Sequence, residues 1–217
     1  MRKINHDDIK IYHIIHVDRL CDIFNDGFLF SDRIMSSRTN AKGTNIGIQR
    51  IKERRLQLKL SSYSDLFVGD CVPFYFCPRS VMLYVICCKN NQDLTYKGGQ
   101  ENILHLEFNL NNVLNWARAN NKRCVFTTSN AGSSYFNDYN DFSQLDIINW
   151  DAINATNWQA VKEEKQAELL VENSLDLRLL DRIGVNNSTI YTKVSTILNK
   201  HAQIYHPKIE VVRDWYY

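Results

Sequence analysis

The chain of 217 residues has little proline and glycine, three and eight residues respectively, and neither gathers in a tract that could separate two domains. Internal repeats and low-complexity segments are also missing from the sequence. With 44% hydrophobic and 23% charged residues, the composition is typical of a globular protein. We therefore expect a single domain over residues 1–217.

No hydrophobic run approaches the roughly 18 residues of a membrane-spanning helix, and charges interrupt the first residues before a signal peptide could form. The six cysteines contain no CxxC pair, and Cys87 and Cys88 lie in the apolar run VMLYVICC. Such cysteines are typical of small buried side chains in a reducing compartment. The sequence thus predicts a cytoplasmic protein with no membrane segment, no disulfide framework and no metal site.

Four generic catalytic motifs are absent as well: GxGxxG, GxxxxGK[ST], HExxH and GxSxG. Their absence argues against Rossmann enzymes, P-loop NTPases, zinc proteases and α/β-hydrolases. The net charge of +2 is too small to indicate a nucleic-acid partner, but residues 49–59 (QRIKERRLQLK) carry five positive charges and one negative. This segment is predicted to form an amphipathic helix with Ile48, Ile51 and Leu58 inward, and an anion-binding face is the alternative.

Residue spacing predicts a mixture of strands and helices. Strands are expected at Lys10–His16, at VPFYF (72–76), at Ile103–Phe108, at Arg123–Thr128, at KQAELLV (165–171) and in the last segment, IEVVRDWYY (209–217). Helical spacing marks residues 17–26 before Gly27, residues 110–120 and residues 189–200, and VMLYVICC (81–88) fits a strand or a short buried helix. Six or seven strands with a few helices predict an α+β fold.

Two polar stretches are candidate binding loops. Residues 31–45 form a long connection without periodicity, which is typical of binding loops or of disorder. Residues 129–142 combine polar residues with four aromatic ones, Tyr135, Phe136, Tyr139 and Phe142. These aromatic side chains would either stack on flat ligands or unpaired bases, or pin the loop to the body of the protein.

Glu168 stands out because it lies among the aliphatic residues of KQAELLV. For an arbitrary glutamate, a solvated outer face is the ordinary interpretation. If the segment is a strand, three alternate residues would enter the core, namely Ala167, Leu169 and Val171, and Glu168 would lie on the opposite face. That geometry suits a carboxylate held against a cleft, although a helix from Trp158 to Glu172 is also compatible with the pattern.

Six ordered segments resemble the DarT family, the DNA ADP-ribosyltransferase toxins of bacterial toxin–antitoxin systems. They are IYHIIHVDRLCDIFNDG, NIGIQRIKERR, GDCVPFYFCPRSVMLY, VFTTSNA with LDIINWDAI, KQAELLV and the closing RDWYY. The third segment is the most diagnostic, since no rule of strand or turn chemistry calls for it. Together the segments extend over nearly the whole chain.

The resemblance implies the ADP-ribosyltransferase fold, a split mixed β-sheet with flanking helices and an NAD cleft. It implies transfer of ADP-ribose from NAD⁺, as co-substrate, to a thymine of single-stranded DNA, with release of nicotinamide and a block to replication. It also implies a partner, an antitoxin with a macrodomain that removes the modification. Guanine in DNA or RNA is the alternative acceptor, and an inactive nucleic-acid-binding module on the same fold is the non-enzyme alternative.

The resemblance also implies roles for particular residues. Glu168 and Arg54 match the catalytic positions, with Arg55 as the alternative to Arg54, because only one of two adjacent arginines is expected to face the cleft. The residues expected to bind NAD are His13, Ile14, Ile15, Asn45, Gly47, Arg54, Arg55, Tyr75 and Arg79. The residues expected to bind DNA are Arg79, Tyr135, Tyr139, Asn157 and Trp158.

One segment departs from the family pattern. Between Trp150 and Glu168 the chain is shorter than in several relatives, and this segment is expected to contact the acceptor strand. We therefore expect the NAD chemistry to be retained, whereas the preferred DNA sequence around the target base could differ.

Overall fold

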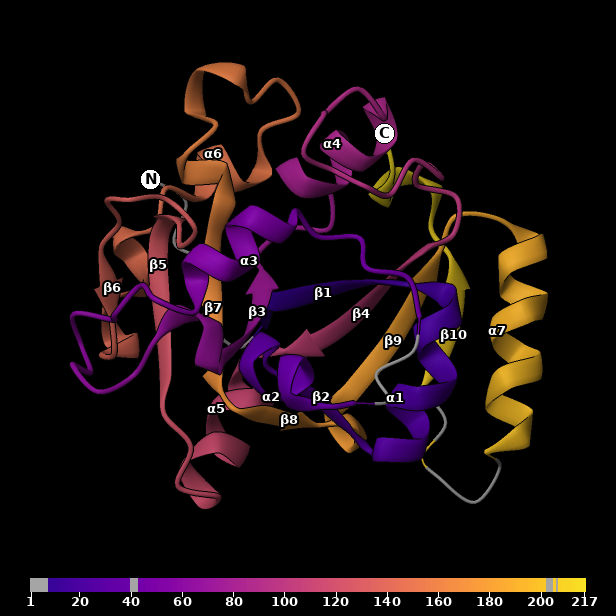
Figure 1. Ribbon diagram of the computed structural model, residues 1–217, viewed down its shortest axis with the longest axis horizontal. Helices are drawn as coiled ribbons and strands as arrows, with labels where there is room; N and C mark the ends of the chain where they lie inside the picture. Colours follow the sequence, from indigo (N-terminus) through magenta and orange to yellow (C-terminus); the bar gives the residue numbers. More distant parts are fainter. Residues whose placement is uncertain (1–7, 40–42, 202–204, 206) are drawn as a thin grey trace.

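The computed structural model describes residues 8–39, 43–201, 205 and 207–217 (Figure 1). In this part of the chain, an eight-stranded sheet has the order β10-β9-β4-β1-β3-β7-β5-β6, and β2 and β8 form a second, small sheet. The strands are β1 Lys10–His16, β2 Phe28–Phe30, β3 Cys71–Tyr75, β4 Ile103–Asn109, β5 Cys124–Asn130, β6 Asp138–Tyr139, β7 Ala167–Glu172, β8 Ser174–Asp176, β9 Leu180–Val185 and β10 Lys208–Val211. Strands β9 and β10 are parallel and the other neighbours in the large sheet are antiparallel, so that sheet is mixed.

Short helices connect and cover the strands. The α-helices are α1 Leu20–Asp26, α2 Asp32–Ser37, α3 Gln49–Arg55, α4 Val81–Cys88, α5 Leu110–Ala119, α6 Trp150–Asn154 and α7 Ser188–Lys200. The 3-10 helices are η2 Val17–Arg19, η3 Val68–Asp70, η4 Phe142–Ile147, η5 Gln159–Val161, η6 Glu164–Gln166, η7 Leu177–Leu179 and η8 Arg213–Trp215. No helix in the described residues is long and apolar enough to cross a membrane.

Most predicted elements are confirmed to within a few residues, and Gly27 ends α1 in the left-handed conformation, as its position predicted. VMLYVICC is a helix because the Ser80 hydroxyl caps its first turn by accepting from Leu83 N. Residues 31–45 contain the short helix α2, while residues 40–42 lie outside the described part.

Two expectations about strands are corrected. KQAELLV is a strand from Ala167 onward, so the alternative of one helix from Trp158 to Glu172 is wrong. The last predicted strand ends at Val211, because the chain then turns into the 3-10 helix η8.

The large sheet splits between β1 and β3. These strands pair at one position, Tyr12 with Tyr75, whereas β1 pairs with β4 along its whole length. Pro73 has no N–H to offer, and its carbonyl oxygen lies 2.8 Å from His13 Nδ1. Beyond the paired position, the contact of the His13 side chain with the Pro73 carbonyl oxygen therefore takes the place of backbone hydrogen bonds between β1 and β3. The separation of the two strands leaves room for a cleft.

The core anchors β7 on both of its faces. Helices α1, α5 and α7 cover the largest cluster of buried residues, and that cluster includes three alternate residues of β7, namely Ala167, Leu169 and Val171. Leu170 faces the other way, into a smaller cluster with Leu60 and Val125. The predicted alternation is confirmed, and Glu168 lies on the face of Leu170.

Candidate active site

A buried ion pair between Arg55 and Glu168 forms the centre of the candidate site. Arg55 Nη1 donates to Glu168 Oε1 at 3.1 Å and Nη2 donates to Oε2 at 2.8 Å. The arginine side chain is 11% exposed and the glutamate side chain 4%. Since a bidentate guanidinium fixes both the position and the plane of a carboxylate, Glu168 has one defined orientation.

The structure corrects the choice between the two adjacent arginines. On helix α3, Ile51 and Lys52 are half-buried and Arg55 is buried, at three, four and seven residues after Ile48, which places Arg55 on the inner face of the helix. Arg54 is rotated by about 100° from Arg55 around the helix axis and is exposed to solvent. Arg55, and not the preferred Arg54, therefore faces the site.

Strand β5 holds Glu168 from the other side. The Glu168 backbone N–H donates to Thr127 Oγ1 at 3.0 Å. The pairing of β5 with β7 shifts between Phe126 and Asn130, and beyond this irregularity Ala131 N donates to Glu168 Oε1 at 3.3 Å. The backbone of β5 thus adds a second donor to the carboxylate that Arg55 orients.

Charge and burial shift the protonation equilibria around this pair. Although burial opposes the charged form, the Glu168 carboxylate raises the pKa of Arg55 above its ordinary value. Tyr75 lies directly opposite Glu168 on the neighbouring strand β3. Burial, reinforced by the Glu168 charge, raises the pKa of Tyr75, so this phenol keeps its proton and can donate it in a hydrogen bond.

A cleft of about 730 Å³ opens where the sheet splits. Of the residues expected to bind NAD, the cleft lining includes His13, Ile14, Ile15, Asn45, Gly47 and Tyr75. Arg55 and Glu168 lie next to the lining, behind Tyr75, rather than in it. The sequence-based set is therefore largely brought together at one place.

His13 enters the cleft as a neutral side chain. Burial lowers its pKa to about 4. Because the Pro73 carbonyl oxygen can only accept, His13 Nδ1 carries the ring proton and Nε2 is left as an acceptor. At Gly47, an added Cβ would lie 2.5 Å from Lys52 Cε, so the absence of a side chain makes room for that lysine.

Three cationic side chains that were not predicted from the sequence also line the cleft. Lys52 donates to Asp32 at 2.6 Å, and Arg38 pairs with Asp26 at 2.5 Å. Arg19, by contrast, forms no ion pair with another described residue. No local pattern in the sequence distinguished Arg19, which lies at the end of the 3-10 helix η2 that follows β1.

The residues expected to bind DNA fall into two groups. Tyr135 is 92% exposed and Asn157 is exposed, so both are free to contact a partner. Tyr139 stacks on Phe126 with ring centroids 5.3 Å apart, and Trp158 is buried. The aromatic loop thus combines both anticipated roles, with Tyr139 pinning it to the sheet and Tyr135 pointing outward.

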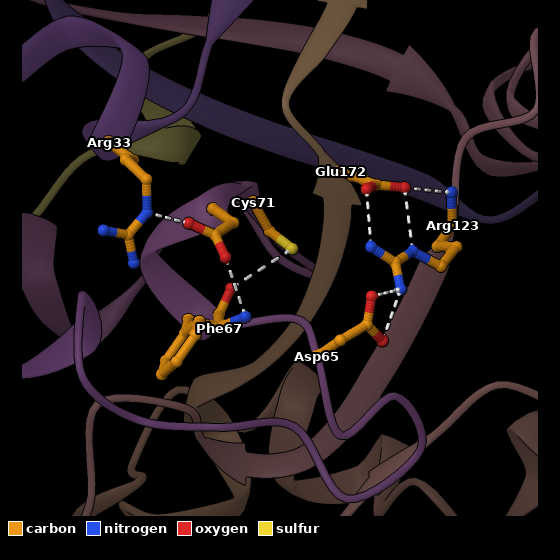
Figure 2. A network of polar contacts seen from close by, with 7 residues as sticks. Arg33, Asp65, Phe67, Cys71, Arg123 and Glu172 are labelled. Atoms are coloured by element: carbon orange, nitrogen blue, oxygen red, sulfur yellow. Dashed lines mark hydrogen bonds and ion pairs between the residues drawn. The ribbon is translucent and has the colours of Figure 1, made fainter. Parts of the chain in front are cut away.

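A second set of charged residues lies at the far end of β7, around an open pocket (Figure 2). Arg123 donates to Glu172 through Nη2 at 2.7 Å and through Nε at 3.0 Å, and its Nη1 reaches both oxygens of Asp65 at 2.8 Å. Arg33 pairs with Asp70, which also accepts from the backbone of Phe67 at 2.9 Å. Each of these arginines is engaged, so this network is a structural clamp.

Comparisons with known proteins agree with the geometry. The family model described as "ssDNA thymidine ADP-ribosyltransferase, DarT" matches residues 12–217. A DNA ADP-ribosyl transferase of Thermus aquaticus is 36% identical over 207 residues, which cover 95% of this chain and 88% of that relative.

Solved structures show the same fold. Thermus sp. 2.9 DarT in complex with ADP-ribosylated ssDNA matches with a TM-score of 0.88 and 31% identity, over 100% of both chains. The same protein in complex with NAD+ matches with a TM-score of 0.81 and 30% identity, over 96% of this chain and 98% of that one. The predicted family and fold are confirmed, and the chain belongs to the DarT family of DNA ADP-ribosyltransferases.

Proposed function

We propose that this protein transfers ADP-ribose from NAD to a thymine base of single-stranded DNA and releases nicotinamide. The observation that carries the proposal is the buried, bidentate Arg55–Glu168 pair, which lies beside a cleft at the split of the sheet. The family description and the solved relative with ADP-ribosylated single-stranded DNA support the choice of acceptor.

The cleft suits NAD in size and in chemistry. Its volume of about 730 Å³ lies within the range of ligand pockets. Arg19, with no ion-pair partner among the described residues, is available to bind the pyrophosphate through two oxygens. The unprotonated Nε2 of His13 can accept a hydrogen bond from a ribose hydroxyl, and Asn45 and Gly47 also line the cleft.

Glu168 supports cleavage of the bond between nicotinamide and ribose. As that bond breaks, its electron pair leaves with nicotinamide and positive charge builds on the ribose carbon, as in glycoside hydrolysis. A carboxylate that is already oriented stabilises this charge without reorganisation. Arg55 and the Ala131 N–H provide the orientation, because they hold both carboxylate oxygens in place.

The same carboxylate is the best placed base for the acceptor. Thymine N3 must lose its proton as it forms the new bond to the ribose carbon, and a general base has to take that proton. Glu168 Oε1 already accepts from Arg55 and from Ala131, whereas Oε2 accepts from Arg55 alone among the described residues. Oε2 therefore keeps a lone pair for the thymine proton.

The acceptor strand is expected to approach across the loop of residues 129–142 and the segment that precedes β7. Tyr135 offers an exposed ring on which a base can stack, and Asn157 offers exposed amide groups. Arg79 lies outside the cleft lining, which fits the acceptor better than NAD. Tyr139 contributes by holding the loop to the sheet through Phe126, and Trp158 by holding the following segment to α4 through Tyr84.

The biological role that follows is that of a toxin in a bacterial toxin–antitoxin system. ADP-ribose on a thymine ring nitrogen removes the hydrogen bond that pairs with adenine, so replication stops at the modified base. A macrodomain partner that removes the modification would act as the antitoxin. Residues 1–217 would act as one ADP-ribosyltransferase domain.

Mass spectrometry of oligonucleotides incubated with the protein and NAD tests the acceptor. We expect an ADP-ribosyl-thymidine adduct, and no adduct on an oligonucleotide in which every thymine is replaced by cytosine. Adducts on guanosine alone, or on RNA alone, would overturn the choice of thymine.

Expression in a bacterial host tests the toxin role. We expect wild-type protein to stop growth, and co-expression of a macrodomain protein active on thymidine adducts to restore it. The Glu168→Ala variant is the matched control and is expected to be harmless. A Glu168→Ala variant as toxic as the wild type would contradict the enzymatic mechanism.

A further inference from the structure

Four side chains from three distant segments meet in one cluster, here called the Tyr217 cluster: Arg79, Tyr84, Trp158 and Tyr217. Tyr84 contacts Trp158 edge-on with ring centroids 5.2 Å apart, and it contacts Tyr217 in the same manner at 5.1 Å. Two of the segments that carry the family resemblance therefore meet here, the one with Arg79 and Tyr84 and the one with Tyr217, together with Trp158 from the segment before β7. Figure 1 shows α4, the marked end of the chain and the loop after α6 at the same edge of the molecule.

Tyr217 is held tightly at both its backbone and its side chain. Its backbone N–H donates to Gln100 Oε1 at 3.0 Å, and the Gln100 amide donates to its carbonyl oxygen. Its hydroxyl shares a hydrogen bond between the carbonyl oxygens of Arg79, at 3.0 Å, and Ser80, at 3.3 Å. Because Ser80 caps α4, Tyr217 is tied to the start of that helix.

Arg79 depends on Tyr217 for its orientation. Its guanidinium carbon lies 4.5 Å from the centre of the Tyr217 ring, which is a cation–π contact. Its Nε atom is buried and has no hydrogen-bond partner among the described residues. The tyrosine ring is thus the contact that sets the plane of a guanidinium lying outside the NAD cleft.

Trp158 links the cluster to the catalytic strand. The Trp158 ring packs edge-on against Tyr84, and Tyr84 in turn contacts Tyr217, so Trp158 is joined to Tyr217 through this ring. The segment that begins at Trp158 continues through η5 and η6 directly into β7 and Glu168. Lys165 fixes this segment to α6, since its buried Nζ donates to the Ile153 carbonyl oxygen at 2.6 Å.

We propose that Tyr217 is a positioning residue for the DNA acceptor. It sets the plane of the Arg79 guanidinium and holds the segment of residues 155–166, so that both are ready for the acceptor strand before it binds. None of the four residues of the Tyr217 cluster belongs to the lining of the cleft proposed for NAD. The proposal rests on the proposed function and adds Tyr217 as a residue that positions the DNA acceptor but not NAD.

Steady-state transfer kinetics with DNA and NAD varied separately test this role. For Tyr217→Ala we expect KM for DNA to rise about tenfold, because the stack under Arg79 and the contact through Tyr84 to Trp158 are lost. KM for NAD is expected to stay within about twofold of wild type, since the cleft is unchanged. Tyr217→Phe retains the ring and is expected to restore KM for DNA to within about threefold of wild type.

Tyr84→Leu is the second variant, in case Tyr217→Ala does not fold. It removes the ring between Trp158 and Tyr217 while leaving the hydrogen bonds of Tyr217 in place, and Tyr84 is 38% exposed. We expect the same selective rise in KM for DNA, about threefold. Tyr191→Ala on α7 is the matched control, because Tyr191 is 41% exposed and lies outside the cluster.

Two outcomes would overturn the proposal. The first is an unchanged KM for DNA in both Tyr217→Ala and Tyr84→Leu, and the second is a parallel loss of kcat and of NAD affinity, as expected from a merely structural role. Failure of the proposed function looks different, since the wild-type protein itself would then form no thymidine adduct.

Discussion

Two glutamates on β7, Glu168 and Glu172, lie four residues apart on the same face of the strand. Each accepts at least two hydrogen bonds from the side chain of one arginine. Glu168 pairs with Arg55 in the interior, while Glu172 pairs with Arg123 at the strand end (Figure 2). The same chemical pair thus occurs twice on one strand, in two environments.

The two ion pairs differ in burial and in their neighbours, and we therefore assign them different functions. Arg123 is shared with Asp65, whose side chain is 74% exposed, and hydrogen bonds from Arg123 lower the pKa of Glu172. Arg55 has a single carboxylate partner in the described residues, and Glu168 lies next to Tyr75 at the wall of the cleft. The half-buried pair of Arg123 and Glu172 joins two strands away from the cleft. A dry pair beside a cavity can in addition stabilise charge that develops in a bound ligand.

The largest difference between the two glutamates is expected in catalysis. Glu168→Gln keeps the shape of the side chain and removes its charge, so we expect transfer to fall by about 10³-fold or more, since both proposed roles are lost. Glu172→Gln is the matched control and is expected to keep activity within about threefold. Adduct formation on a thymine-containing oligonucleotide measures both. Equal losses of transfer activity in Glu168→Gln and Glu172→Gln would contradict a special catalytic role for Glu168.

Next in size is the effect of removing the buried arginine. Arg55→Ala leaves the Glu168 carboxylate buried without a partner, which is expected to cost about 3–5 kcal/mol of the free energy of unfolding. Arg55→Lys keeps a positive charge but loses the bidentate geometry, and we expect more than tenfold lower activity from a folded protein. Urea titrations and transfer assays measure the two quantities.

The adjacent residue supplies the control for that experiment. Arg54→Ala changes an exposed side chain, so we expect the free energy of unfolding to change by no more than about 0.5 kcal/mol. KM for NAD is expected to be that of the wild type. A loss of NAD binding in Arg54→Ala, with Arg55→Lys fully active, would restore the assignment that sequence reasoning preferred.

The smallest expected effect is the pH dependence of the half-buried pair of Arg123 and Glu172. Because the folded-state pKa of Glu172 is lowered, the pair stabilises the folded protein above the ordinary glutamate pKa, and this contribution disappears as the pH falls through the lowered value. Glu172→Gln is expected to lose no more than about 1 kcal/mol at neutral pH, given the solvent exposure of the pair. In urea titrations below about pH 4 the difference from wild type is expected to shrink. A difference that stays constant over this range would show that Arg123 does not act through the charge of Glu172.

Much of the site could be anticipated from local patterns. The alternation in KQAELLV predicted both the strand and the face of Glu168, and the strand at residues 10–16 placed His13 correctly. The helical spacing that placed Ile48 and Ile51 inward also points to Arg55, because residues seven and four positions later share their face. This spacing was present in the sequence, but the family match of the KERR segment favoured Arg54 over its neighbour Arg55 as the catalytic arginine.

Other features had no local signal. Arg19 lines a cleft that forms because β1 and β3 pair at one position, Tyr12 with Tyr75, and then diverge. The sequence of neither strand indicates this separation. Ala131 reaches Glu168 only through an irregularity in the pairing of β5 with β7. Arg79 meets Tyr217 across 138 residues of sequence. Contacts of this kind depend on register and chain packing, which residue periodicity does not encode.

The sequence by itself determined most element types, the alternation that buries both neighbours of Glu168 and, through its resemblance, the family and reaction class. The reason is that periodicity of 2 or 3.6 residues selects strand or helix and its inward face before any distant contact forms. Tertiary structure alone decided which cleft cation has no ion-pair partner among the described residues and which aromatic ring holds Arg79. Those choices depend on burial and on partners from distant segments, because a charged group is buried at low cost only where an opposite charge or a hydrogen-bond partner compensates for the lost water.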